Sequence, residues 1–315
     1  MEKRPEKKFI PVMLTPFKES GDIDFDGLTR LTEMYLDAGV KGLFANCQSS
    51  EMFELTDDEK LGVVKHVMKI TAARVPVVAV GNFGETISAQ ATFINKIYDT
   101  GVQAAIIVTG LIALESEKPE IFEEKVFRLF ELTGEIPLGF YECPEPYKRV
   151  LSAEQLRKFV ATGRVIYHKD TCLDIGMVRE KLKATNAYPS FGLYDAYVIN
   201  AVDALKAGAA GLSCIQGNFF PELIVWLCEH YDDDSSTEDV GKVQYFLKDN
   251  MEVMHNSYPS IAKYYLQKSG LNISTFTRSK SGSFTAVVKD KLDHLFDQYN
   301  LLKKNIEMQE LKLFP

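Results

Sequence analysis

The sequence predicts a (β/α)8 barrel followed by a domain of helices. Eight short apolar runs rich in β-branched residues recur along the first two thirds of the 315-residue chain, and segments with helical periodicity separate them. Strands that alternate with helices pair in parallel through right-handed crossovers. Eight such units suit a closed barrel, which takes about 250 residues. No Gly-x-Gly-x-x-Gly follows the first run to indicate a dinucleotide-binding sheet instead.

The apolar runs are the predicted strands. They are Phe9–Leu14, Gly42–Asn46, Pro76–Val80, Ala104–Val108, Ile136–Tyr141, Val165–Lys169, Pro189–Leu193 and Ala210–Ile215. Between the early runs, Gly27–Ala38 and Lys60–Ala72 carry apolar residues at helical spacing. The crossovers near the seventh and eighth runs are short.

The strand pattern stops beyond Pro221, where helices are expected. An acidic stretch, Asp232–Ser236, breaks the chain, and a polar loop is expected at Asn272–Ser283. The predicted helices are Val240–Met254, Ser260–Lys268 and Thr285–Met308. We therefore predict a catalytic barrel at residues 1–230 and a helical domain at residues 231–315.

Composition restricts the class of protein. Apolar residues make up 46% and charged residues 25% of the chain, which is ordinary globular usage. The net charge of -8 argues against nucleic acid or an anionic membrane as a partner, because both attract clustered Lys and Arg. Runs such as Leu223–Cys228 are far shorter than the roughly 20 residues of a membrane helix. The start, MEKRPEKKF, lacks the apolar core of a signal peptide, so a soluble cytoplasmic protein is expected.

Lys169 ends the sixth predicted strand, where barrel enzymes carry their functional side chains. Alternation along the strand places Val165, Tyr167 and Lys169 on one face and His168 on the other. A lysine inside a barrel is desolvated, which lowers its pKa and leaves a neutral amine able to attack a carbonyl group. The alternative is a strand-end lysine that extends into solvent or pairs with Asp170.

Two further segments follow strand ends. Tyr141 ends the fifth strand, and its phenol can carry a proton to and from a reacting oxygen; the alternative is an aromatic residue at the barrel rim. Cys47–Glu51, with the sequence CQSSE, enters a helix after the second strand. Its N–H groups and the hydroxyls of Ser49 and Ser50 can hold a carboxylate, although a plain helix cap looks the same in sequence.

A zinc site is the main competing interpretation of the strand ends. Cys47, Cys143, Cys172 and Cys214 lie near them, and His168 is next to Lys169. The histidines are scattered, however, and His168 is predicted to face outward, whereas zinc ligands usually occur at short spacing. The five cysteines are odd in number and contain no Cys-x-x-Cys pair. We therefore predict reduced cysteines that pack as small apolar groups, with no metal and no cofactor.

These segments resemble the dihydrodipicolinate synthase and N-acetylneuraminate lyase family, which are Schiff-base-forming class I aldolases with a (β/α)8 fold. PVMLTPF is similar to the first strand of the family, and CQSSEMFELTDDEK to its Gly-Thr/Ser-Thr-Gly-Glu carboxylate loop. FYECP is similar to Tyr-Asn-x-Pro, and HKDT falls on the Schiff-base strand. KAGAAGLSCIQGNFFPEL resembles the eighth-strand segment, and YPSIAKYYLQKSGL the Asn-Pro-x-x-x-Lys helix.

The resemblance implies a role for each matching residue. Lys169 would form the Schiff base and Tyr141 would act as acid and base. The residues implied to bind substrate are Gln48, Ser49, Ser50, Thr171, Asp195 and Ser213. The family also implies a homotetramer or homodimer.

The departures from the family pattern bear on the substrate. Both loop glycines are replaced, by Cys47 and Ser50, and Gln48 takes the place of the first hydroxyl residue. The tyrosine that the synthases carry after the fourth strand has no counterpart in Thr109–Ala113. Their arginine for the semialdehyde carboxylate would fall near Pro146, with Lys148 and Arg149 close by. Condensation with aspartate semialdehyde is therefore not expected.

The lyases of the family carry Gly-Tyr-Asp-Glu where this chain has Leu193–Ala196, which keeps Asp195 and loses the glutamate. We expect a class I lyase or aldolase that acts on a pyruvate-type 2-oxo acid, hydroxylated or derived from a sugar. Two alternatives stay open: a Schiff-base dehydratase of a deoxy sugar acid, and a non-catalytic protein that binds a 2-oxo acid.

Overall fold

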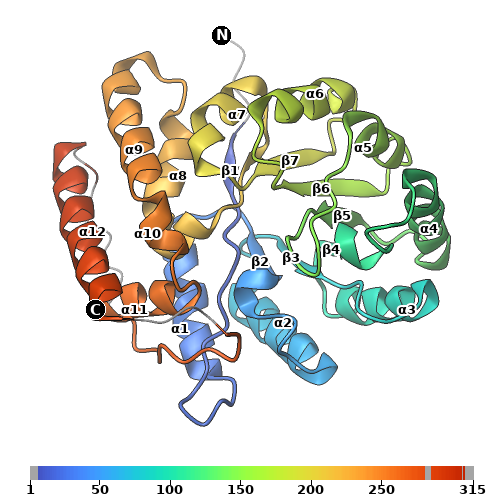
Figure 1. Cartoon of the computed structure of the whole chain (residues 1–315), viewed down its shortest axis with the longest axis horizontal. Coiled ribbons are helices and arrows are strands. Elements are labelled where there is room, and N and C mark those ends of the chain that lie inside the picture. The colour runs from blue at the N-terminus through green and yellow to red at the C-terminus, as the bar shows by residue number, and fades with distance from the viewer. Residues whose placement is uncertain (1–5, 281–284, 307, 309–315) are drawn as a thin grey trace.

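A parallel eight-stranded sheet forms the centre of the molecule in the computed structural model, which describes residues 6–280, 285–306 and 308 (Figure 1). The strand order is β1-β8-β7-β6-β5-β4-β3-β2. A parallel bridge between Val12 and Phe44 joins the two ends of that order, with Phe44 N donating to Pro11 O at 3.0 Å. The sheet thus closes on itself, and the predicted (β/α)8 barrel is confirmed.

The strands and the helices around them alternate along the chain. The strands are β1 (Lys8–Phe9), β2 (Leu43–Asn46), β3 (Val77–Val80), β4 (Ala104–Val108), β5 (Leu138–Tyr141), β6 (Val165–Asp170), β7 (Gly192–Asp195) and β8 (Gly211–Leu212). The helices are α1 (Phe25–Asp37), α2 (Asp57–Thr71), α3 (Ile87–Tyr98), α4 (Pro119–Leu132), α5 (Ala153–Val160), α6 (Ile175–Thr185), α7 (Ala201–Ala207) and α8 (Pro221–His230). Strand β1 is shorter than predicted because Pro11 has no N–H to continue the ladder.

The start of α2 shows how local sequence sets the helix bounds. Thr56 accepts a hydrogen bond from Glu59 N at 3.3 Å, and the Glu59 carboxylate accepts one from Thr56 N at 2.9 Å. This reciprocal pair satisfies two N–H groups that have no partner within the helix. Asp57 and Asp58 add negative charge at the positive end of the helix dipole. Helix α2 therefore begins directly after the loop that carries Ser49.

A bulge in β6 decides which side chains enter the barrel. Leu138 pairs with Val165 and Gly139 with Tyr167, so Ile166 is an extra residue in β6. The prediction that Val165 shares a face with Lys169 is therefore wrong: Val165 packs in the core between the sheet and the helices. Tyr167 belongs to the cluster inside the barrel. Alternation fails here because a bulge shifts the period by one residue.

Within the described residues, four α-helices follow the barrel: α9 (Thr237–Asp249), α10 (Met251–His255), α11 (Ser260–Lys268) and α12 (Ala286–Asn305). The helix predicted at Val240–Met254 is divided at Asn250, and the end of the predicted polar loop lies outside the described residues. Figure 1 shows α9, α10 and α12 gathered on one side of the barrel. The ring of Phe220, at the start of α8, lies 4.3 Å from that of Tyr299 and 5.3 Å from that of Phe246, centroid to centroid. These rings join the helices to the barrel.

None of the described helices combines the length and the apolar character that crossing a membrane requires.

Candidate active site

Lys169 and Tyr141 lie side by side inside the barrel. The register aligns Tyr141 of β5, Lys169 of β6 and Tyr194 of β7, so their side chains share the inner face. Lys169 is only 4% exposed, and its Nζ lies 4.0 Å from the centre of the Tyr141 ring. The two residues that the sequence placed at neighbouring strand ends therefore meet in the structure.

The surroundings of Lys169 favour the neutral amine. Burial lowers the pKa of Lys169; the thiols of Cys47, Cys143 and Cys214 oppose this, and the charge of Lys148 adds to it. Among the described residues, the side chain of Lys169 makes no hydrogen bond and no ion pair, so the alternative of pairing with Asp170 does not occur. An amine without a counter-ion in a site of low dielectric is the state in which lysine acts as a nucleophile.

The Tyr141 phenol stays protonated and donates its hydrogen bond to the loop that carries Gln48. Burial, followed by the nearby Cys143 thiol, raises the pKa of Tyr141 well above its usual range. The phenol donates to Gln48 Oε1 at 3.3 Å, and Cys143 Sγ lies 3.8 Å from the same oxygen. Because the O–H is donated to Gln48, the lone pairs of the Tyr141 oxygen are left to accept a hydrogen bond from a bound substrate.

The two loop serines differ in what they can offer a ligand. Ser50 is fully buried, donates to Met13 O at 2.7 Å and accepts from Cys47 N at 3.2 Å, so its hydroxyl holds the loop together. Ser49 instead accepts a hydrogen bond from the Tyr258 hydroxyl at 2.8 Å. Ser49 is therefore the loop serine whose own O–H is left for a ligand.

Contacts of Glu51 with α11 and with the loop after it hold the same loop in place. Glu51 has a left-handed backbone, with φ of 58°. Its carboxylate accepts from Lys263 Nζ at 2.8 Å, from Arg278 N at 2.7 Å and from Ser279 N at 2.8 Å. Lys263 is itself fully buried. Helix α11 and the loop after it are therefore part of the structure that shapes the site.

Thr171 and Ser213 use their hydroxyl hydrogens within the protein. The Thr171 hydroxyl donates to the Glu142 carbonyl. Ser213 lies inside the barrel, where it donates to Ile10 O at 2.8 Å and accepts from the Tyr167 hydroxyl at 3.1 Å. The structure thus brings both near the strand ends while leaving neither hydrogen free, and their role toward substrate stays a prediction.

Asp195 is set apart from Lys169 by the register. Tyr194 is the partner of Lys169, whereas Asp195 is the partner of Asp170. Burial raises the pKa of Asp195 to about 7. Its Oδ1 accepts from Tyr197 N at 2.8 Å, and its buried Oδ2 has no partner among the described residues. The register places Asp195 beside Asp170 of the outer face, so the structure does not bring it to Lys169, and its role toward a substrate hydroxyl stays a prediction.

Lys148 and Arg149, the two cations near Pro146, have different roles. Arg149 binds the Tyr147 hydroxyl at 2.8 Å and Leu114 O at 2.7 Å, so it fastens the loop after β4. Lys148 donates to Thr171 O at 2.9 Å and lies close enough to Lys169 to lower its pKa. Lys148 is therefore the cation that faces the site.

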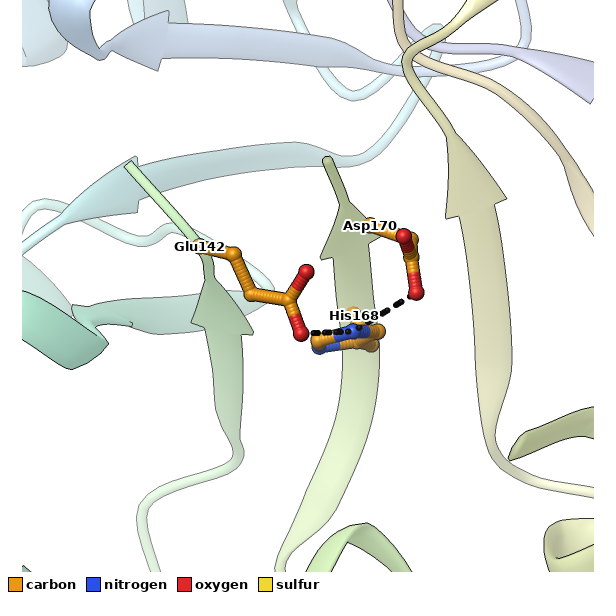
Figure 2. Close-up of side chains that lie close together, drawn as sticks. All are labelled: Glu142, His168 and Asp170. Atoms are coloured by element: carbon orange, nitrogen blue, oxygen red, sulfur yellow. Dashed lines mark ion pairs between the residues drawn. The ribbon is translucent and has the colours of Figure 1, made fainter. Parts of the chain in front are cut away.

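The outer face of the same strands carries a buried charge cluster of Glu142, His168, Asp170 and Lys181. Figure 2 shows Glu142 at the end of β5 next to His168 and Asp170 of β6. Lys181 Nζ, from α6, lies 2.7 Å from Glu142 Oε1 and 2.7 Å from Asp170 Oδ2. His168 Nε2 lies 3.4 and 3.5 Å from the same two oxygens. His168 thus points out of the barrel, as predicted.

The ligand atoms of Glu142, His168 and Asp170 lie within 4.8 Å of one another, a spacing that a metal ion could bridge. Lys181 already supplies the positive charge there, since its ammonium group contacts both carboxylates. Burial would lower the pKa of His168, and the two carboxylates outweigh burial and raise it. The cluster is therefore an ion network balanced by side chains of the chain itself.

Sequence reasoning did not identify Tyr258 or Lys181. Tyr258 stands where the family motif has the asparagine of Asn-Pro-x-x-x-Lys, and that replacement was the available signal. Lys181 follows Val178 and precedes Thr185 at helical spacing on the buried face of α6. A lysine on an apolar helical stripe indicates a buried anion, but the sequence does not say which one.

Comparison with known proteins identifies the family of the chain. The model of the dihydrodipicolinate synthetase family matches residues 5–299. The chain is 24% identical to 4-hydroxy-tetrahydrodipicolinate synthase of Shewanella sp. (strain ANA-3) over 220 residues, which is 70% of this chain and 73% of that protein. It is 27% identical to the protein of the same name from Wigglesworthia glossinidia brevipalpis over 211 residues, 66% of this chain and 68% of the relative.

Solved structures share the fold. A monomeric dihydrodipicolinate synthase variant superposes with a TM-score of 0.84 at 18% identity, covering 94% of this chain and 97% of that one. YagE, a prophage protein of the dihydrodipicolinic acid synthase family from E. coli K12 in complex with pyruvate, gives 0.83 at 19%, covering 94% and 99%. CdNal from Clostridium difficile in complex with mannosamine gives 0.81 at 17%, covering 93% and 99%. With the family model spanning nearly the whole sequence, the chain belongs to the dihydrodipicolinate synthetase family of aldolase-type lyases.

Proposed function

We propose that this protein is a Schiff-base-forming lyase that acts on a pyruvate-type 2-oxo acid, hydroxylated or derived from a sugar. The observation that carries the proposal is Lys169, which is buried without a counter-ion among the described residues and lies 4.0 Å from the centre of the Tyr141 ring. Family membership supports the chemistry, and the pyruvate and mannosamine named for two structural neighbours belong to those proteins. Neither ligand settles the substrate of this chain.

In the proposed mechanism the Lys169 amine attacks the C2 carbonyl of the substrate. Tyr141 carries protons to and from the carbinolamine oxygen, which leaves as water to give the iminium ion. The iminium then accepts the electron pair of the C3–C4 bond, and the proton of the C4 hydroxyl passes to Tyr141 as the aldehyde departs. The iminium is the electron sink, so the reaction needs no cofactor.

We further assign the binding groups. The Ser49 hydroxyl and the N–H groups of Gln48 and Ser49 would hold the substrate carboxylate. Lys148 would attract the far, oxygen-rich end of the substrate, and Asp195 Oδ2 would accept one of its hydroxyls. We propose that the protein acts as a homodimer or homotetramer, which sedimentation velocity can test.

Borohydride reduction in the presence of pyruvate tests the mechanism. The reduced pyruvyl adduct should appear by intact mass and map to the peptide that carries Lys169. Lys169→Ala should give no adduct, while Lys206→Ala, a change at an exposed lysine on α7, should react as the parent does. An unchanged mass, or an adduct on another lysine, would overturn the proposal.

The products separate the two types of lyase. Cleavage between C3 and C4 releases pyruvate and an aldehyde, whereas dehydration gives one product that has lost water and kept every carbon. Incubating the protein with 3-deoxy and 4-deoxy sugar acids and identifying the products by mass spectrometry distinguishes these outcomes. Imine formation without turnover of any of them would favour a binding protein.

A further inference from the structure

Tyr258 brings the C-terminal helices into the candidate active site. It lies between α10 and α11, and its hydroxyl donates to Ser49 Oγ at 2.8 Å, 209 residues away in sequence. The same hydroxyl accepts from Asn218 Nδ2 at 2.6 Å. The nearby Tyr258 hydroxyl also raises the pKa of Tyr141, so it lies close to the proposed acid and base. Nothing in the family resemblance gives this tyrosine a role.

Asn218 can be oriented without ambiguity. Its Nδ2 lies 2.9 Å from Val12 O, a carbonyl that can only accept a hydrogen bond. The nitrogen of the amide must therefore face Val12 and Tyr258. The amide oxygen then faces the Tyr35 hydroxyl, which donates to it.

The direction of every later hydrogen bond follows from this one. Because Asn218 donates to the Tyr258 oxygen, the hydrogen of Tyr258 is left for Ser49. Because Ser49 accepts from Tyr258, its own hydrogen must go elsewhere, and within the part of the chain that the structure describes no acceptor lies within reach of it. Ser49 is only 5% exposed, so that hydrogen is nearly shut off from water. A buried donor that lacks a partner is costly, and a bound anion would satisfy it.

We propose that Tyr35, Asn218 and Tyr258 form a one-way hydrogen-bond chain that makes the Ser49 hydroxyl a fixed donor to the carboxylate of the substrate. Tyr258 is thereby a positioning residue supplied by the helical domain. The inference rests on the proposed 2-oxo acid substrate. It accounts for a loop that has lost both glycines and the first hydroxyl of the family motif: one serine is held in the donor orientation by residues outside the loop.

Tyr258→Phe tests the chain, with pyruvate and methyl pyruvate as probes. Both carry the ketone that Lys169 would attack, but only pyruvate carries a carboxylate. Tyr258→Phe should raise the half-saturating pyruvate concentration for borohydride trapping about 5- to 20-fold, the range of one hydrogen bond to a charged group that is partly lost. It should change trapping of methyl pyruvate less than twofold. Tyr245→Phe, at a 68% exposed tyrosine of α9, is the matched control and should change neither.

Two further variants keep the test decisive. Ser49→Ala should raise the half-saturating pyruvate concentration by a similar factor. The double variant Ser49→Ala/Tyr258→Phe should bind pyruvate no more weakly than Ser49→Ala, because Tyr258 acts through Ser49. If Tyr258→Phe does not fold, Asn218→Asp serves instead. Its carboxylate would accept the hydrogen bond of the Tyr258 hydroxyl, which reverses the direction of the hydrogen bonds. Pyruvate binding should then weaken more than binding of methyl pyruvate. Equal effects on both probes, an effect on pyruvate below twofold, or additive effects in the double variant would overturn the inference.

Failure of this inference can be told apart from failure of the proposed function. If the parent protein forms no adduct at Lys169, the Schiff-base proposal fails. Calorimetric titration of Lys169→Ala and of Lys169→Ala/Tyr258→Phe with pyruvate then still measures carboxylate binding alone. Weaker pyruvate binding in the double variant would support the chain, and equal binding would overturn it.

Discussion

Two buried lysines, Lys169 and Lys181, lie on opposite faces of the same strands and have opposite properties. Lys169 is 4% exposed, contacts no carboxylate in the part of the chain that the structure describes, and has a lowered pKa. Lys181 is 1% exposed, contacts two carboxylates, and has a raised pKa because Glu142 and Asp170 outweigh its burial. Burial alone therefore does not decide the state of a lysine. The anions within contact distance do.

The alternation of β5 and β6 produces both environments from adjacent residues. Tyr141 and Lys169 face inward, while Glu142, His168 and Asp170 face the helices. The outer network also holds backbone: Glu142 accepts from Leu151 N at 2.9 Å and from Thr171 N at 3.1 Å. We interpret the outer face as the support that fixes the strand ends and the inner face as the reactive site.

Lys169→Met gives the largest expected effect. Turnover and imine trapping should fall on the order of 10⁴-fold or more, because no other group replaces the amine. The free energy of unfolding should stay the same or rise by up to about 2 kcal/mol, since an unpaired polar group gives way to an apolar side chain of similar size. Urea unfolding followed by circular dichroism measures the second quantity. A loss of stability would show that Lys169 has a structural partner.

Lys181→Met should lower the stability of the protein and leave its reactivity in place, the opposite of Lys169→Met. Removing the cation leaves two carboxylates buried against each other, and breaking a buried pair in this way costs about 3–5 kcal/mol. The urea midpoint should fall accordingly at pH 7. Whatever folded protein remains should still form the adduct at Lys169, because the reactive groups are untouched. A variant as stable as the parent would remove the support role from the outer cluster.

The contrast between the two lysines also shows what the sequence could predict. Lys169 and Tyr141 were found because strand ends can be located from short apolar runs, and barrels carry their chemistry there. Val165 was placed on the wrong face because a bulge depends on Gly139 in the neighbouring strand: a Cβ at Gly139 would lie 2.9 Å from Tyr167 O, so the close approach at this point requires glycine. Lys181 and Tyr258 were missed because their partners are set by packing between distant segments.

The smallest expected effect is the pH dependence of the outer cluster, read with His168→Gln. Folding raises the pKa of His168 above its unfolded value near 6.5, since Glu142 and Asp170 outweigh burial. Its stabilising contribution is therefore fully present below about pH 6.5 and is lost as the pH rises through the higher folded pKa. Each unit of that rise corresponds to about 1.4 kcal/mol.

The stability difference between the parent and His168→Gln should accordingly shrink between pH 6 and pH 9. His66 supplies the control, because burial and Lys69 lower its pKa. The charged form of His66 is disfavoured by folding, so the difference between the parent and His66→Gln should grow as the pH rises to about 6.5 and change little above about pH 7.5. Urea midpoints at several pH values measure both. If the two differences change with pH in the same direction, His168 is not held as a cation by the two carboxylates, and the outer cluster carries a net negative charge that only Lys181 offsets.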